Sequence, residues 1–126
     1  MAMDFLDPLD PDQLRRFLRW CCCLRLPLHD EKLTQSEFAH ALDAAGFGFE
    51  REVPLSKRDC VDFMLGGLAV ELKIKGRASA IRRQLDRYAT HDRVKAVCLL
   101  TARAVLLPDQ INGKPAYLVS LSQGWL

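Results

Sequence analysis

Two acidic residues and a lysine stand where a hairpin closed at Gly66-Gly67 would bring them together. The Gly-Gly pair is a strong two-residue turn signal, and closure there sets Asp62 opposite Glu71. Lys73 follows two residues later on the same face. Directly opposed carboxylates are destabilising, so the arrangement favours a cation between them. Carboxylate oxygens are the ligands that a hard divalent cation takes, and such a cation acidifies a bound water.

The other face of this hairpin is an unbroken apolar surface, which predicts that it is core. Its members are Val61, Phe63, Leu65, Leu68, Val70, Leu72 and Ile74. Asp59 is a rival for Asp62 as the partner of Glu71, but it falls in the register of the apolar face at the start of the strand. The pattern therefore favours Asp62.

Two helices and a strand are expected before the hairpin. Asp10-Pro11 is typical of a helix start, and the apolar stripe that follows predicts a helix over about 11–25. Thr34-Gln35-Ser36-Glu37 matches a capping box and predicts a second helix over about 34–45. The segment Phe47–Val53, which Pro54 closes, is expected to be a strand.

A helix and further strands are expected after the hairpin. Gly76 ends the alternation before a helix over about 77–89. Lys95–Thr101 is mostly apolar, and the helical crossover before it predicts a buried strand parallel to a strand of the hairpin. Ala104–Leu107 and Tyr117–Leu121 flank Asn112-Gly113 and suggest a last hairpin.

This order of elements predicts an α/β fold in which helices flank a mixed β-sheet. A chain of 126 residues with 49% hydrophobic content is expected to form one domain over 1–126. No apolar run approaches the roughly 20 residues of a membrane span, and the first residues do not read as a secretion signal. Five cysteines without C-x-x-C spacing suggest neither a disulfide framework nor a zinc site. We expect a protein of the reducing cytoplasm with no membrane association.

Charge is unevenly spread along the chain. The net charge is +2, but residues 51–95 hold eleven Lys and Arg against six Asp and Glu. If a metal neutralised two of those acids, the segment would form a basic surface of the kind that a nucleic-acid partner requires. The alternative is an ordinary solvated surface.

The pattern D-x8-E-x-K on a hairpin, after a helix bearing Glu37 and before one bearing Gln84-x3-Tyr88, resembles the PD-(D/E)xK nuclease superfamily. The resemblance covers roughly residues 34–101 and is closest to the Holliday-junction-resolvase and RecB-like branch. Val61 replaces the proline of the signature. The resemblance implies a restriction-endonuclease-like α-β-β-β-α-β core, with the helix over about 11–25 as an addition. It also implies Mg²⁺- or Mn²⁺-dependent hydrolysis of DNA, selective for DNA structure rather than sequence.

The resemblance also assigns roles to particular residues. It implies a catalytic set of Asp62, Glu71, Lys73, Glu37 and Gln84. It implies metal ligands from Asp62, Glu71, Glu37 and the carbonyl of Leu72. Lys73 would orient the attacking water or neutralise charge on the phosphoryl oxygens. Glu37 is equally explained by the capping box, and Gln84 by a hydrogen bond within the core.

The expected partner is DNA. Candidate contacts are Lys57, Arg58, Lys75, Arg77, Arg83, Arg87 and Tyr88, whereas Arg82 is expected to pair with Asp86. A homodimer is expected because branched DNA needs two symmetric cuts. The helix over about 11–25 is its expected interface, since Phe17, Leu18, Trp20 and Cys21–Cys23 surround most of it. The alternative is that this helix simply covers the sheet.

Other functions compete with a nuclease. An antiparallel hairpin with a solvated charged face needs no catalysis, and a nuclease-like fold also serves as a non-catalytic module that binds nucleic acid or protein. A cysteine nucleophile is a weak alternative, because the histidines and thiols form no local signature.

Overall fold

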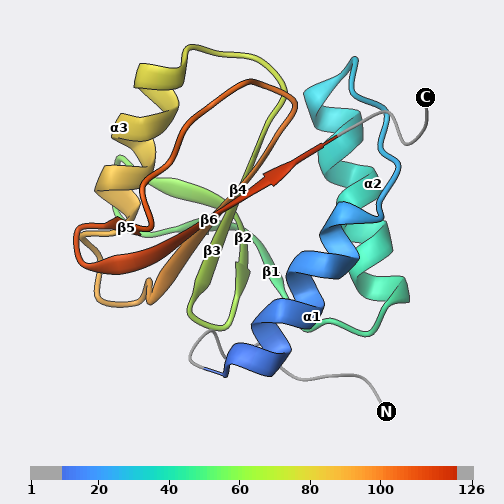
Figure 1. The fold of residues 1–126 in the computed structure, drawn as a ribbon, viewed down its shortest axis with the longest axis horizontal. Helices are drawn as coiled ribbons and strands as arrows, with labels where there is room; N and C mark the ends of the chain where they lie inside the picture. The colour runs from blue at the N-terminus through green and yellow to red at the C-terminus, as the bar shows by residue number, and fades with distance from the viewer. Residues whose placement is uncertain (1–9, 122–126) are drawn as a thin grey trace.

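The computed structural model describes residues 10–121, which form three layers with a six-stranded sheet in the middle. Helices α1 (Pro11–Cys22) and α2 (Glu31–Ala44) cover one face of the sheet, and α3 (Ala78–Tyr88) covers the other (Figure 1). The predicted α/β class, a mixed sheet between helices, is confirmed.

The strand order of the sheet is β1-β2-β3-β4-β6-β5. The strands are β1 (Glu50–Pro54), β2 (Cys60–Leu65), β3 (Leu68–Lys73), β4 (Ala96–Thr101), β5 (Gln110–Ile111) and β6 (Lys114–Ser120). The pairs β1–β2 and β2–β3 are antiparallel, whereas β3–β4 and β4–β6 are parallel, as predicted for the strand after the crossover. The carboxyl ends of β3, β4 and β6 therefore meet at one end of the sheet, here called the carboxyl edge.

Both N-terminal helices differ from their predicted bounds. α1 ends at Cys22, where the N–H of Cys23 bonds back to Trp20 and Cys21. α2 begins at Glu31, because the side chain of Asp30 accepts the N–H of Leu33 at 3.2 Å and serves as N-cap. Thr34 is buried inside the helix and its hydroxyl donates to the Pro27 and Asp30 carbonyls. The predicted capping box is therefore wrong.

The strand predictions were wrong at two places. β1 begins at Glu50 rather than Phe47. Ala104–Leu107 is loop, and β5 lies at Gln110–Ile111 instead. The reason for the position of β5 is the tight turn at Asn112-Gly113, whose φ values are 50° and 76°. A two-residue turn pairs the residues directly beside it, so the strand before this turn lies at Gln110–Ile111.

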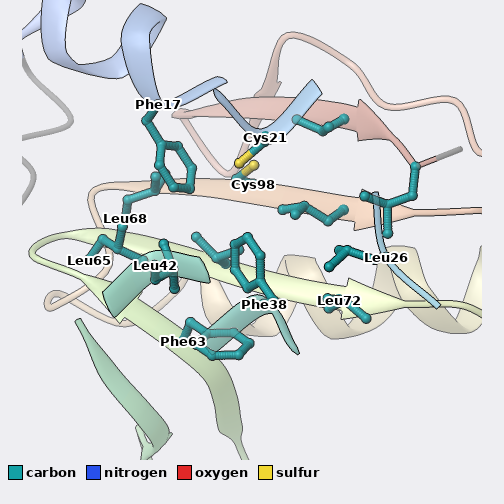
Figure 2. Packing of buried hydrophobic residues seen from close by; sticks show 14 of the residues in the cluster. Phe17, Cys21, Leu26, Phe38, Leu42, Phe63, Leu65, Leu68, Leu72 and Cys98 are labelled. Atoms are coloured by element: carbon teal, nitrogen blue, oxygen red, sulfur yellow. The ribbon is translucent and has the colours of Figure 1, made fainter. Parts of the chain in front are cut away.

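Each face of the sheet has its own hydrophobic cluster. Beneath α1 and α2, the rings of Phe38 and Phe63 meet edge to face with centroids 5.0 Å apart (Figure 2). Beneath α3, a second cluster includes Met64 and Ala69 from the acid-bearing face of the hairpin. That face is therefore part core as well as part polar.

Val61 packs in the second cluster, so its predicted place on the other face was wrong. The β1–β2 ladder holds Arg51↔Phe63 and Val53↔Val61, but the pair between them is missing. There Glu52 has a φ of 51°, a backbone conformation that interrupts regular alternation. The change of face occurs at Asp62.

α1 uses its apolar residues within the chain. Phe17 and Cys21 are buried against the sheet. The centroid of the Trp20 ring lies 5.9 Å from the ring centroid of Phe38 and 4.9 Å from that of Phe47. The helix thus covers the sheet, which was the alternative to a dimer interface. The homodimer stays a prediction, but the apolar residues of α1, its expected interface, pack within the chain. Among residues 10–121, no helix is long and apolar enough to span a membrane.

The five cysteines are free, and two of them belong to the core. Figure 2 shows the sulfur atoms of Cys21 and Cys98 near each other between α1 and β4. Burial raises the pKa of the Cys98 thiol to about 12. A thiol in that state is a poor nucleophile at neutral pH.

Candidate active site

β2 and β3 pair in the predicted register near their turn and separate toward the carboxyl edge. The paired residues are Phe63↔Val70, Met64↔Ala69 and Leu65↔Leu68. Gly66 has a φ of 61°, as the first residue of a type II′ turn requires. The same register sets Asp62 opposite Glu71, just past the last paired residues.

At that point the two carboxylates take over the hydrogen bonding between the strands. The N–H of Asp62 donates to Glu71 Oε1 at 3.2 Å, and the N–H of Leu72 donates to Asp62 Oδ2 at 2.9 Å. Each acid therefore accepts a backbone N–H from the opposite strand. Because the backbone fixes both carboxylates, their separation is set by the fold and not by side-chain rotation. Lys73 Nζ lies 3.3 Å from Glu71 Oε2.

Burial and repulsion perturb all three groups. Glu71 is 1% exposed, and burial followed by the Asp62 charge raises the pKa of its carboxyl to about 8. Burial likewise raises the pKa of Asp62. Burial lowers the pKa of Lys73, but the charges of Glu71 and Asp62 outweigh it, and the net shift is upward. The pair therefore favours binding a proton or a cation over two bare negative charges.

The donor atoms suit a hard divalent cation. Within residues 10–121, Asp62 Oδ1 and Glu71 Oε2 accept no backbone N–H, and Lys73 lies against the latter. The N–H and C=O of a strand residue point to the same side, so the Leu72 carbonyl faces β2 together with its N–H. Within the described part of the chain, no three His, Cys, Asp or Glu side chains gather as a metal group. The fitting set is therefore two carboxylates and a carbonyl, completed by waters as Mg²⁺ accepts.

Glu31 is the helical glutamate that lies at this site. Its Oε1 accepts the N–H of Ile74 at 3.0 Å, directly after Lys73, and its charge raises the pKa of Asp62. Glu37 is exposed, and no hydrogen bond or ion pair joins it to the site within residues 10–121. The structure therefore does not bring Glu37 to the carboxylates. The missed signal was Asp30, an equally good N-cap that stands directly before an acidic residue.

Gln84 and Tyr88 support the site from α3. Gln84 Nε2 donates to the Tyr88 hydroxyl at 2.7 Å, and that hydroxyl donates to the Cys60 carbonyl at 2.8 Å. The polar partner expected beneath Gln84 is therefore Tyr88. Burial, and then the charges of Glu71 and Asp62, raise the pKa of Tyr88. The phenol is fully buried, so it positions β2 near Asp62 and is not exposed for contact with a nucleic acid.

Asp59 serves the scaffold rather than the site. Its Oδ1 lies 2.9 Å from Arg87 Nε, and its Oδ2 lies 3.1 Å from His91 Nε2. The hydrogen bond from Arg87 outweighs burial and, with His91, lowers the pKa of Asp59. This network ties the start of β2 to the end of α3. The network therefore supports Asp62 rather than Asp59 as the acid of the site. It also holds Arg87, which was a predicted phosphate contact, in an ion pair.

The other predicted contacts to nucleic acid are exposed. Lys57 and Arg58 lie on the β1–β2 loop, Lys75 and Arg77 on the β3–α3 loop, and Arg83 on α3. Arg82 pairs with Asp86 at 3.3 Å, as predicted. Lys32, directly after Glu31, is also exposed. So is Arg103, two residues after Thr101, which is the β4 partner of Lys73. Sequence reasoning missed these two because only the fold brings them to the carboxyl edge.

Comparison with protein-family models, curated proteins and solved structures found no match to this chain. The resemblance to the PD-(D/E)xK nucleases therefore stays a prediction, which rests on the sequence motif.

We expect Glu71→Gln to flatten the pH dependence of stability in the metal-free protein. The pKa of Glu71 is about 8 in the fold against 4.5 as its ordinary value, so the folded state holds the proton more tightly. Its contribution is complete below about pH 4.5 and declines as the pH rises toward about 8. Thermal melting in EDTA across this range should show wild type losing stability relative to the variant. Parallel curves would mean that Glu71 is ionised throughout.

Proposed function

We propose that this protein is a divalent-metal-dependent nuclease that hydrolyses DNA phosphodiester bonds and selects DNA by structure. The observation that carries the proposal is the Asp62–Glu71 pair, fixed by backbone hydrogen bonds at the open end of a hairpin with Lys73 beside it. The resemblance to the resolvase-like and RecB-like nucleases supports it.

Each residue has a role in this proposal. Asp62, Glu71 and the Leu72 carbonyl hold Mg²⁺ or Mn²⁺, which when bound polarises the phosphate and acidifies a water. Lys73 orients that water or neutralises charge on the phosphoryl oxygens. The remaining residues position these groups: Glu31 fixes the backbone after Lys73, and Gln84 holds the Tyr88 hydroxyl against the Cys60 carbonyl.

The test is cleavage of labelled single-stranded, duplex, flapped and four-way-junction DNA, with Mg²⁺, with Mn²⁺ and with EDTA. We expect cleavage that requires metal and that differs among the four topologies. An RNA strand in parallel separates the two nucleic acids. Asp43→Asn, an exposed acid at the end of α2, is the control and should cleave as wild type does. Absent or metal-independent cleavage of every substrate would contradict the proposal.

A non-catalytic nucleic-acid-binding module is the second candidate. The observation that favours it is the ion pair between Lys73 and Glu71, which already balances one of the two negative charges without a metal. DNA binding that is unaffected by Mg²⁺ and leaves every substrate intact would favour this candidate.

DNA affinity should fall steeply as salt rises, because the exposed cations around the site release counterions on binding. Each phosphate contact adds about 0.9 to the slope of log affinity against log salt, so Lys57→Ala with Arg58→Ala should reduce it by about 2. The matched control is Arg15→Ala with Arg16→Ala on α1, which covers the other face of the sheet from α3. Fluorescence anisotropy across a salt series measures both. A flat series, or an equal change in the control, would contradict the assigned surface.

A further inference from the structure

Glu52 adopts a backbone conformation that glutamate rarely takes. Its φ is 51°, although it lies in the middle of β1. Among residues 10–121, Asn112 is the one other non-glycine residue with a positive φ, and it lies in a two-residue turn that requires one. A strand does not require one, because the left-handed region crowds the Cβ atom against the backbone. Such conformations persist where the surrounding structure holds them, and they cluster at functional sites.

The residue directly opposite Glu52 on β2 is Asp62, the first acid of the candidate site. The two strands keep one continuous register and pair on either side of this row, at Arg51↔Phe63 and Val53↔Val61. On the other side of β2, pairing with β3 ends at Phe63↔Val70. Asp62 therefore stands where the ladders to both neighbouring strands are interrupted.

Both strands also change face at this row. On one side of it, the guanidinium of Arg51 lies over the Phe63 ring, 5.4 Å from the ring centroid, and Phe63 packs beneath α1 and α2. On the other side, Val53 and Val61 pack beneath α3. Regular alternation keeps residues two apart on one face. The outer part of the β1–β2 ribbon is therefore turned relative to the rest of the sheet.

The hydrogen bond of the Asp62 N–H also departs from a regular ladder. Counted from the two-residue turn, Phe63 is hydrogen-bonded to β3, so a regular ladder would point the N–H of Asp62 to β1 and Glu52. That N–H donates instead to Glu71 Oε1 on β3, at 3.2 Å. The bond that Glu52 does not accept is therefore one of the bonds that build the site.

We propose that the left-handed backbone of Glu52 positions Asp62 for metal binding. It denies the N–H of Asp62 its regular partner on β1, so that this N–H turns to Glu71 and the Asp62 carboxylate reaches the N–H of Leu72. The role belongs to the backbone, because the exposed carboxylate of Glu52 makes no hydrogen bond or ion pair within residues 10–121. The inference rests on the proposed function, to which it adds a positioning residue.

The test compares Glu52→Val with wild type, because a β-branched residue strongly disfavours a positive φ. The variant should favour the regular ladder, and a binding-competent state that is less populated lowers the apparent affinity in proportion. We expect calorimetry to give Mg²⁺ binding about tenfold weaker than in wild type, which is about 1.4 kcal/mol. In EDTA, NMR couplings across hydrogen bonds should identify the acceptor of the Leu72 N–H as the Asp62 carboxylate in wild type and as a backbone carbonyl of β2 in the variant.

Three control variants separate the backbone of Glu52 from its side chain. Glu52→Gly favours a positive φ, so it should bind Mg²⁺ as wild type does and should melt at no lower temperature. Glu52→Gln keeps the shape of the side chain without its charge and should also bind as wild type does. Glu50→Val makes the same substitution two residues earlier on β1, where φ is not positive, and should leave Mg²⁺ binding unchanged.

Equal Mg²⁺ affinity of Glu52→Val and wild type would overturn the inference while the nuclease proposal stands. Weaker binding by Glu52→Gln would overturn it as well, because the carboxylate itself would then act. If Glu52→Val does not fold, Glu52→Gly decides, since weaker binding or a lower melting temperature in that variant contradicts the inference. If wild type binds no Mg²⁺ and cleaves no DNA, the nuclease proposal falls. The NMR couplings need no metal and then still decide whether Glu52 places Asp62 against Leu72.

Discussion

Asp62→Asn should lower the rate of DNA cleavage by at least about a thousandfold, because it removes one charge from the pair proposed to bind the metal. The amide oxygen still accepts the N–H of Leu72, so the hydrogen bond at 2.9 Å and the fold should survive. Lys73→Ala should have a comparable effect and should also leave the fold intact, since its side chain is 23% exposed and its ion pair within residues 10–121 is with Glu71. Single-turnover cleavage and thermal melting measure activity and folding separately.

Two glutamates on α2 provide a matched control for this result. Glu31→Ala should lower activity, because it removes the oxygen that accepts the N–H of Ile74 and fixes the backbone after Lys73. Glu37→Ala on the same helix should cleave as wild type does. Loss of folding in both Asp62→Asn and Lys73→Ala would mean that the charged residues are structural. Equal effects of the two glutamate variants would contradict the assignment of Glu31.

Asp59→Ala should destabilise the fold by about 2 kcal/mol, because a hydrogen bond to a charged group contributes about 1.5–3 kcal/mol and Arg87 and His91 both lose their acceptor. The side chain of Asp59 is 6% exposed, and Arg87 and His91 both lie against it. The pKa of Asp59 is lowered below its ordinary value of 3.8, so its contribution is present above that pH and is lost only as the pH falls through the lowered value. Urea unfolding at neutral pH gives the cost directly.

Asp86→Ala is the control for this prediction. Asp86 pairs with Arg82 on the exposed side of α3, and both side chains are 42% exposed. Surface pairs contribute about 0–1 kcal/mol, so this variant should unfold nearly as wild type does. Equal unfolding midpoints for Asp59→Ala and Asp86→Ala would mean that the buried network does not hold β2 to α3.

The hairpin was predictable because its information is local. Gly66-Gly67 and the alternation beside it set the register, and the structure keeps Phe63 opposite Val70 and thus Asp62 next to Glu71. Val61 was not predictable, because its change of face coincides with a missing pair between β1 and β2, where Glu52 on the other strand has a φ of 51°. The pattern within one strand carries no record of that interruption.

Glu31, which accepts the N–H of Ile74 beside the site, was missed for a different reason. Two N-caps compete at the start of α2, and the capping-box motif at Thr34 outweighed the simpler signal at Asp30. The predicted helix start was therefore three residues late, and Glu31 lay outside the predicted helix, which left Glu37 as the helical glutamate that was considered. Arg87 was also misjudged, because its partner Asp59 lies on a different element and only the packing of α3 brings them together.

The most direct test of the account is a calorimetric titration of wild type and Glu71→Gln with Mg²⁺, at pH values below and above the Glu71 pKa of about 8. A cation that binds between Asp62 and Glu71 competes with the proton shared by the pair. We therefore expect Mg²⁺ binding to wild type that strengthens as the pH rises toward about 8, with release of a proton, and that is lost in Glu71→Gln. Equal Mg²⁺ binding by the two proteins, or none by wild type at any pH, would contradict it.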